Sequence, residues 1–127
     1  MRPNWIVIGA LAGGIAVFCA AYGEHALRRG ISEGDFAVWE KAVRYQLVHA
    51  LALIQFGTFS DARAKAGRAP RSFAGWAFLL GIVLFCGTLY THALGAPDRF
   101  LHVAPLGGLA MIVGWIAFAL AALGGTR

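Results

Sequence analysis

The stretch Trp39-Glu-Lys-Ala-Val-Arg-Tyr-Gln-Leu-Val-His-Ala-Leu51 leads charged and polar side chains directly into an apolar run that continues to about Phe59. The hydrocarbon core of a bilayer offers these groups no water, so each needs a partner on another helix, a bound ligand or a water-filled cavity. A segment of this kind is stable in a membrane only when other helices surround it. We therefore expect it to lie inside a helical membrane bundle, with any functional site beside it.

The whole chain has the composition of a membrane protein. Of its 127 residues 59% are hydrophobic and only 13% are charged, which is outside the range of soluble domains. A helix needs about 20 mainly apolar residues to cross about 30 Å of hydrocarbon. Four stretches meet this requirement, at about 4–26, 37–59, 73–94 and 101–123. The sequence therefore predicts an all-α membrane protein in which residues 1–127 form one domain, a compact bundle of four transmembrane helices.

Basic residues are distributed unevenly between the two sides of this predicted bundle. One side holds both termini and the connection between the second and third spans, with Arg2, Arg63, Lys65, Arg68, Arg71 and Arg127. The connections on the other side hold Arg28, Arg29 and Arg99, diluted by Glu33, Asp35 and Asp98. By the positive-inside rule this predicts that the N- and C-termini are cytoplasmic, although Lys41 and Arg44 near the outer end of the second span oppose it.

The basic connection has two interpretations. Its residues Arg63, Lys65, Arg68 and Arg71 could contact anionic lipid headgroups, each cation being worth about 1 kcal/mol near the surface, or they could act only as topology determinants. No aromatic side chains or recognition helix accompany the charges, so we expect no nucleic-acid binding. Membrane lipids are the expected partners, and a larger membrane complex and a homo-oligomer both stay open.

Small residues form stripes on the first and last spans. Such stripes let a neighbouring backbone approach closely, and they predict tight helix packing there. The glycines expected to serve this packing are Gly9, Gly13, Gly23, Gly107, Gly108 and Gly114. Cys19 and Cys86 fall inside spans without a Cys-x-x-Cys spacing, so we expect them to pack as small apolar residues.

If the four spans cross the bilayer alternately, their polar residues come together near the outer surface, and all four histidines lie in the same leaflet. The candidate ligand-binding residues are His25, Arg44, Tyr45, Gln46, His49 and Tyr90, and a second tier comprises Glu24, Thr88, His92 and His102. Glu40 and Arg44 are four residues apart, a spacing that favours an ion pair.

Several interpretations of this cluster compete. Imidazoles with a carboxylate could bind a metal or haem iron, but no two histidines are spaced i, i+3 or i, i+4, so we expect neither a metal nor another cofactor. A general base such as His49 or His25 has no nucleophile or phosphate cradle beside it, so we assign no catalytic residue. An internal hydrogen-bond network stays open. So does a pocket for a lipid, quinone or other small amphiphile, with Arg44 at an anionic or carbonyl group and Tyr45 beside it.

The same residues carry a resemblance to a known family. The motifs are Gly23 with His25, Tyr45-Gln46 with His49, Gly87-Thr-Leu-Tyr90, Pro105-Leu-Gly-Gly108 and Gly114-Trp115, in this order across the four spans. In these motifs the chain resembles a family of small bacterial membrane proteins called domain of unknown function 423, whose mitochondrial relatives include transmembrane protein 256. The resemblance implies a four-helix protein of the bacterial inner membrane, or of its mitochondrial counterpart, with no established activity. His92 and His102 match no motif position of the family, and Glu24 stands where the family usually has a small residue.

The sequence therefore favours a non-catalytic membrane protein. Its role would be accessory or structural within a larger complex, or it would interact with lipids through its helix faces. The alternative is a binding protein or enzyme that uses the outer polar pocket for a small amphiphile or a metal.

Overall fold

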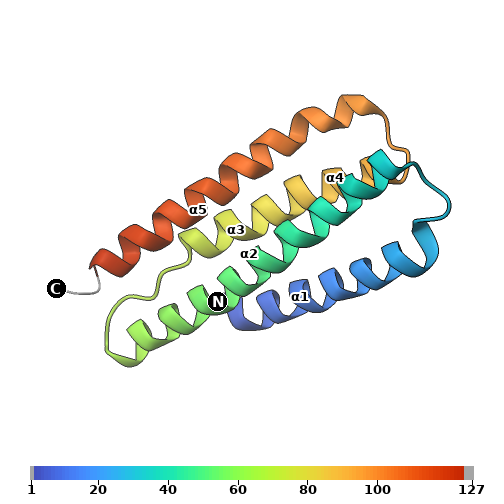
Figure 1. The fold of residues 1–127 in the computed structure, drawn as a ribbon. Helices are drawn as coiled ribbons and strands as arrows, with labels where there is room; N and C mark the ends of the chain where they lie inside the picture. The colour runs from blue at the N-terminus through green and yellow to red at the C-terminus, as the bar shows by residue number, and fades with distance from the viewer. Residues whose placement is uncertain (1, 125–127) are drawn as a thin grey trace.

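The computed structural model describes residues 2–124, which form helices and contain no strand (Figure 1). Short π- and 3-10-helical segments, labelled η, continue several of the α-helices. The elements are α1 (Trp5–Tyr22), η1 (Gly23–Leu27), α2 (Glu33–Lys65), α3 (Phe73–Gly81), η2 (Ile82–Cys86), α4 (Gly87–Ala93), η3 (Asp98–Val103) and α5 (Ala104–Gly124). They make four helical rods, because η1 extends α1, η2 joins α3 to α4, and η3 leads into α5. The all-α prediction is confirmed.

The helices begin where the sequence offers caps. The side chain of Asn4 accepts a bond from the backbone N–H of Val7 at 3.1 Å, and Ser32 accepts one from Asp35 N at 3.0 Å. Each bond satisfies one of the N–H groups that have no partner in a first helical turn. Pro105 is the second residue of α5, where its missing N–H costs nothing.

Three of the rods are long and apolar enough to cross a membrane, namely Trp5–Leu27, Phe73–Ala93 and Asp98–Gly124. α2 is the longest helix, at 33 residues, and the polar side chains along it keep it outside that set. It continues through Lys65, beyond the predicted end at residue 59, so the connection to α3 is shorter than the sequence suggested. At 1.5 Å per residue α2 is about 50 Å long and exceeds a bilayer core of about 30 Å.

Each rod runs antiparallel to its neighbour in sequence (Figure 1). α1 packs along α2, and α5 packs along α3 and η2. The rod formed by α3, η2 and α4 also contacts α2, so it lies between α2 and α5. Both described ends of the chain and the 66–72 connection lie at one end of the bundle, which we call the inner end. The 28–32 and 94–97 connections lie at the other, outer end.

Glycines permit the closest helix contacts. A Cβ built on Gly9 would lie 2.7 Å from the carbonyl oxygen of Ala50 in α2, and one on Gly114 would lie 2.7 Å from the Phe78 ring in α3. Gly23 meets the Trp39 indole equally closely, and Gly107 meets the backbone of Phe85. Gly13 and Gly108 have ordinary van der Waals room, so the predicted packing glycines are not equally constrained. Three further close approaches, at Gly57, Gly75 and Gly81, were not predicted.

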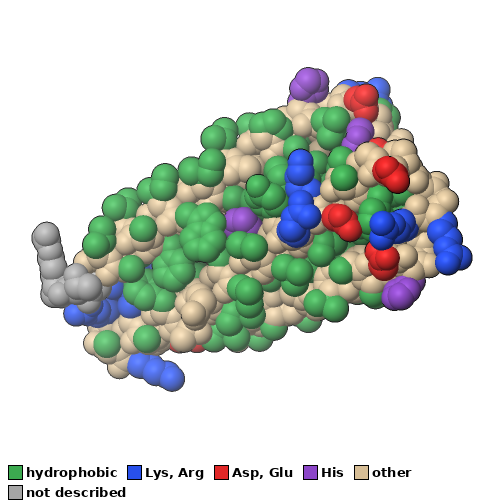
Figure 2. All heavy atoms as spheres, viewed as in Figure 1, with side chains coloured by type: hydrophobic (Ala, Val, Ile, Leu, Met, Phe, Trp, Pro, Cys, Tyr) green, Lys and Arg blue, Asp and Glu red, His purple; other side chains and the backbone are tan. Residues whose placement is uncertain are grey.

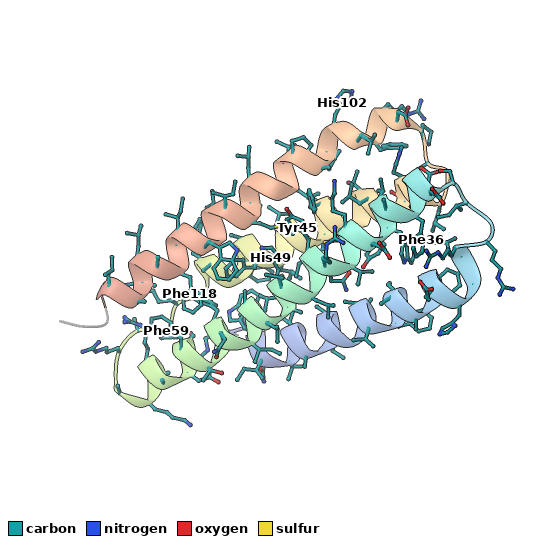
Figure 3. The ribbon with its side chains drawn as sticks, in the orientation of Figure 1. Phe36, Tyr45, His49, Phe59, His102 and Phe118 are labelled. Carbon is teal, nitrogen blue, oxygen red and sulfur yellow. The ribbon has the colours of Figure 1, made fainter. Side chains whose placement is uncertain are left out.

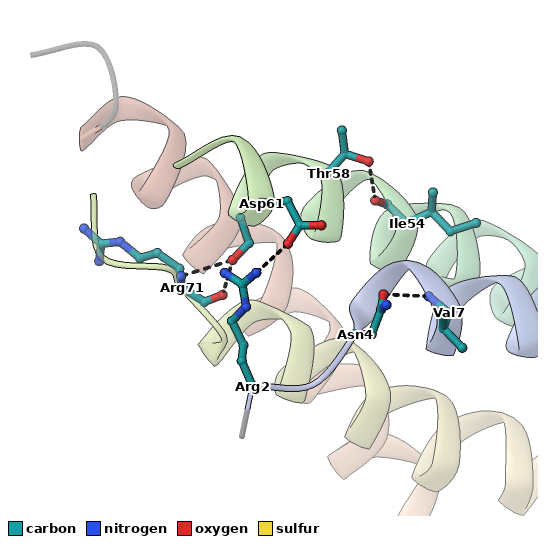
Figure 4. A network of polar contacts seen from close by, with 8 residues as sticks. Arg2, Asn4, Val7, Ile54, Thr58, Asp61 and Arg71 are labelled. Carbon is teal, nitrogen blue, oxygen red and sulfur yellow. Dashed lines mark hydrogen bonds and ion pairs between the residues drawn. The ribbon is translucent and has the colours of Figure 1, made fainter. Parts of the chain in front are cut away.

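The inner end is held by polar contacts outside the apolar core (Figure 4). Buried Ser60 donates its hydroxyl to the carbonyl oxygen of Arg71 at 2.8 Å and accepts from its backbone N–H at 3.2 Å. The Arg2 guanidinium lies 2.6 Å from the Asp61 carboxylate. These contacts connect the end of α2 to the residues just before α1 and α3.

Charged side chains gather at the two ends of the bundle, and hydrophobic side chains cover the face between them (Figure 2). Acidic groups on this face are concentrated at the outer end. The band of apolar surface has the distribution expected of a protein that contacts hydrocarbon along its length.

Candidate functional site

Both ring nitrogens of His49 have bonding partners. Nδ1 lies 2.7 Å from the carbonyl oxygen of Tyr45, one turn earlier in α2, and Nε2 lies 3.1 Å from Nε1 of Trp115 in α5. A carbonyl oxygen only accepts and an indole N–H only donates, so these partners assign the proton to Nδ1 and make Nε2 the acceptor. Only 5% of His49 is exposed. It therefore has no free nitrogen for a metal ion or for proton abstraction.

Gln46 joins three helices from a buried position. Its Nε2 donates to the carbonyl oxygen of Ala12 in α1 at 2.8 Å, and the Tyr90 hydroxyl in α4 donates to its Oε1 at 2.9 Å. The indole of Trp39 makes a second link to α1, because its Nε1 donates to the carbonyl oxygen of Cys19 at 2.8 Å. These interhelical bonds, together with that of His49, satisfy most of the polar groups that α2 carries into the bundle.

Tyr45 differs from these residues because its side chain is half exposed. Its ring stacks on His49 with centroids 6.2 Å apart and packs against Phe85 at 4.8 Å. Within residues 2–124 its hydroxyl has no hydrogen-bond partner, so it is available to an outside group.

Glu24, His25 and Arg44 do not join this network. The Glu24 carboxylate accepts bonds from Arg28 at 2.9 and 3.0 Å, so it does not pair with Arg44. The expected pair between Glu40 and Arg44 does not form either. Glu24, Glu40 and Arg44 instead line one polar pocket of about 330 Å³ between α1 and α2. His25 is exposed, and nothing in the described chain bonds to it.

The remaining histidines lie at the outer end, away from His49. His92 has Nε2 3.9 Å from a carboxylate oxygen of Asp35 and Nδ1 3.5 Å from one of Asp98, so it lies between the starts of α2 and η3 without a hydrogen bond to either carboxylate. His102 is exposed on the outside of the bundle (Figure 3), and Thr88 is half-buried in α4. Over the described residues no three His, Cys, Asp or Glu side chains could hold a metal ion.

A groove between α2 and α5 lies beside His49, and we call it the α2–α5 groove. Figure 3 shows Tyr45, His49, Phe118 and Phe59 along it. Its outer half, of about 590 Å³, is lined by Tyr45, His49, Phe85, Pro105, Gly108, Leu109, Met111, Ile112 and Trp115. Its inner half, of about 650 Å³, is lined by Val48, Leu51, Ala52, Gln55, Thr58, Phe59, Trp115 and Phe118. Trp115 belongs to both halves, and its bond to His49 holds it between them.

The groove was not predicted from the sequence. Its lining is apolar, and in a membrane protein apolar residues that line a groove have the same pattern as those that face lipid. Trp115 could have indicated the groove, because a tryptophan of a membrane protein usually lies at the membrane interface and Trp115 lies in the middle of α5.

The basic residues of the inner end are partly engaged within the chain. Arg63 Nε donates to the carbonyl oxygen of Ala69 at 3.3 Å, and its guanidinium carbon lies 5.8 Å from the Phe59 ring centre. Lys65 is exposed, and the backbone of Arg71 is bonded to Ser60. Contact of these residues and of Arg68 with anionic lipid stays a prediction.

Comparisons with known proteins identify relatives over most of the chain. The family model described as "Protein of unknown function (DUF423)" matches residues 19–108. A UPF0382 membrane protein of Staphylococcus haemolyticus is 38% identical over 112 residues, which cover 88% of each chain. The UPF0382 membrane protein YwdK of Bacillus subtilis is 34% identical over 119 residues, covering 94% of this chain and 95% of YwdK. No solved structure gives a significant match.

Proposed function

The chain belongs to the DUF423 family of bacterial membrane proteins, and we propose that it is a non-catalytic, four-span protein that binds an amphiphile of the membrane in the α2–α5 groove. The observation that carries this proposal is the groove itself. It is apolar, it opens to the surface of the bundle that would face hydrocarbon, and its outer half contains Tyr45, whose hydroxyl has no partner among the described residues.

The packing of α2 supports its assignment as a fourth span. α2 lies antiparallel along the full length of two rods that are apolar enough to cross a membrane. Its buried polar groups, Gln46 and His49, have partners on those neighbours and on α5, so the absence of water in hydrocarbon does not penalise them. Four crossings also agree with the position of both chain ends at the inner end of the bundle.

The orientation follows from the basic residues of the inner end. Arg2, Arg63, Lys65, Arg68 and Arg71 all lie there, and Arg127, the last of the predicted set, is outside the described residues. We infer from the positive-inside rule that this end is cytoplasmic, and from the bacterial membrane proteins among the relatives that the membrane is the inner (plasma) membrane.

The interior of the bundle supports a non-catalytic role. Gln46 bonds to α1 and to Tyr90 of α4, His49 bonds to Trp115 of α5, and within residues 2–124 no set of metal ligands lies among them. Bonds of this kind stabilise helix association, typically by about 0.6 kcal/mol each. We therefore assign the predicted polar cluster chiefly to structure and assign binding to the neighbouring groove.

Native mass spectrometry of the protein extracted in a mild detergent tests the binding proposal. We expect a non-protein amphiphile at stoichiometric occupancy on the wild type. Val48→Trp places a large side chain in the inner half of the groove and should remove most of that occupancy. Val17→Trp is the matched control, because Val17 is similarly exposed, at 59% against 52% for Val48, and lies on α1 away from the groove.

Two results would count against the proposal. Wild-type protein that is stable and carries no bound species would leave the groove without a ligand. Equal occupancy in Val48→Trp and Val17→Trp would move the binding site elsewhere on the bundle. Recovery of a partner protein in place of a lipid would favour the accessory role within a larger complex.

A further inference from the structure

We infer that the amphiphile of the α2–α5 groove is an anionic phospholipid, whose acyl chain lies along the groove and whose phosphate lies at Lys41. This inference rests on the proposed groove function and adds the chemical class of the ligand. It is carried by the charge at the outer end of the groove and by the groove's length.

Lys41 continues the groove-lining stripe of α2 by one further turn. Residues three and four apart share a face of a helix, and from Lys41 this spacing leads to the lining residues Tyr45, Val48, Ala52, Gln55 and Phe59. The Cα–Cβ bonds of a helix tilt toward its N-terminus, so the lysine side chain extends toward the outer end, where headgroups lie. Lys41 is exposed and has no ion pair or hydrogen bond within residues 2–124.

The surrounding charges favour an anion there. No acidic side chain lines either half of the groove. Arg44 is also exposed, but it lines the pocket between α1 and α2 together with Glu24 and Glu40, so Lys41 is the cation assigned to the groove. The nearest acidic neighbour in α2 is Glu40, which lines the separate pocket between α1 and α2.

The dimensions of the groove suit a phospholipid tail. From Tyr45 to Phe59 the helix rises about 21 Å at 1.5 Å per residue. One leaflet contributes about half of a hydrocarbon core of about 30 Å, so a chain attached to a phosphate near Lys41 ends within the groove. Tyr45 follows Lys41 by one helical turn, about 6 Å along α2, which is the level expected for the ester groups of such a lipid.

The experiment compares phosphatidylglycerol with phosphatidylcholine of identical acyl chains, added to delipidated full-length protein in detergent and read by native mass spectrometry. One cation near an anionic headgroup contributes about a fivefold gain in affinity. We therefore expect the wild type to prefer phosphatidylglycerol about fivefold. Lys41→Gln should abolish this preference, whereas Arg44→Gln, in the separate pocket, should leave most of it.

Lys65→Gln is the matched control, because it removes an exposed lysine from the opposite end of the same helix. An unchanged preference in Lys41→Gln together with a loss in Lys65→Gln would assign headgroup recognition to the inner end and overturn the inference. Equal binding of both lipids by the wild type would overturn the anionic class while leaving groove binding intact. Failure of Val48→Trp to reduce binding of either lipid would instead refute the proposed function. A dimer without bound lipid, lost in Val48→Trp, would assign the groove to a second copy of the chain and overturn both.

Discussion

Tyr90→Phe removes one hydroxyl, and with it the bond that joins α4 to Gln46 of α2 at 2.9 Å. Interhelical hydrogen bonds in membrane proteins contribute about 0.6 kcal/mol on average and up to about 1.7 kcal/mol. We therefore expect Tyr90→Phe to lower the free energy of unfolding by about 0.6 to 1.7 kcal/mol. Gln46→Leu also removes the bond to Ala12 of α1, so it should cost about twice as much.

The two substitutions share one bond, so their effects should not add. The double variant should be about as unstable as Gln46→Leu alone, which corresponds to a coupling free energy of about 0.6 to 1.7 kcal/mol. The assay is reversible unfolding in mixed detergent micelles, followed by helical circular dichroism. Tyr22→Phe is the control, because Tyr22 is 43% exposed and its hydroxyl has no partner in the described chain. Additive single effects, or equal losses in Tyr90→Phe and Tyr22→Phe, would refute the assignment of this bond as a structural link.

Three further substitutions test the packing, the inner end and the topology. Gly107→Ala should destabilise the bundle by about 1 to 3 kcal/mol in the same unfolding assay, because the added Cβ would meet the backbone of Phe85 in the neighbouring helix. Gly87→Ala is the control, since a Cβ there has open space, and it should be neutral or stabilising. Ser60→Ala should lower the free energy of unfolding by about 1 to 3 kcal/mol, since it removes two hydrogen bonds between a buried hydroxyl and the backbone of Arg71. An unchanged midpoint would contradict this. Lys65→Cys and Ala96→Cys, each made in a chain without the native cysteines, should react with a membrane-impermeant maleimide from opposite sides of the membrane. Labelling of both positions from one side would exclude four crossings.

The helical character of the chain could be predicted from local features. Apolar runs of span length imply helices because a bilayer leaves no other way to satisfy the backbone. The starts of α2 and α5 also depend on residues close in sequence, because Ser32 caps the first turn of α2 and Pro105 lies in the first turn of α5. The end of α2 at Lys65 was missed, because the basic residues of its last turn look like a connection and are also good helix formers near a C-terminus.

What only the tertiary structure decided is the partner of each polar group. Helical periodicity shows which residues share a face, but the rotation of each helix and the choice of its neighbour depend on packing between distant segments. The sequence therefore identified His49 and Gln46 as residues that need partners, and the fold supplied Trp115 and the carbonyl of Ala12. The α2–α5 groove has the same origin, because it exists only where two helices far apart in the chain lie beside each other without closing the space between them.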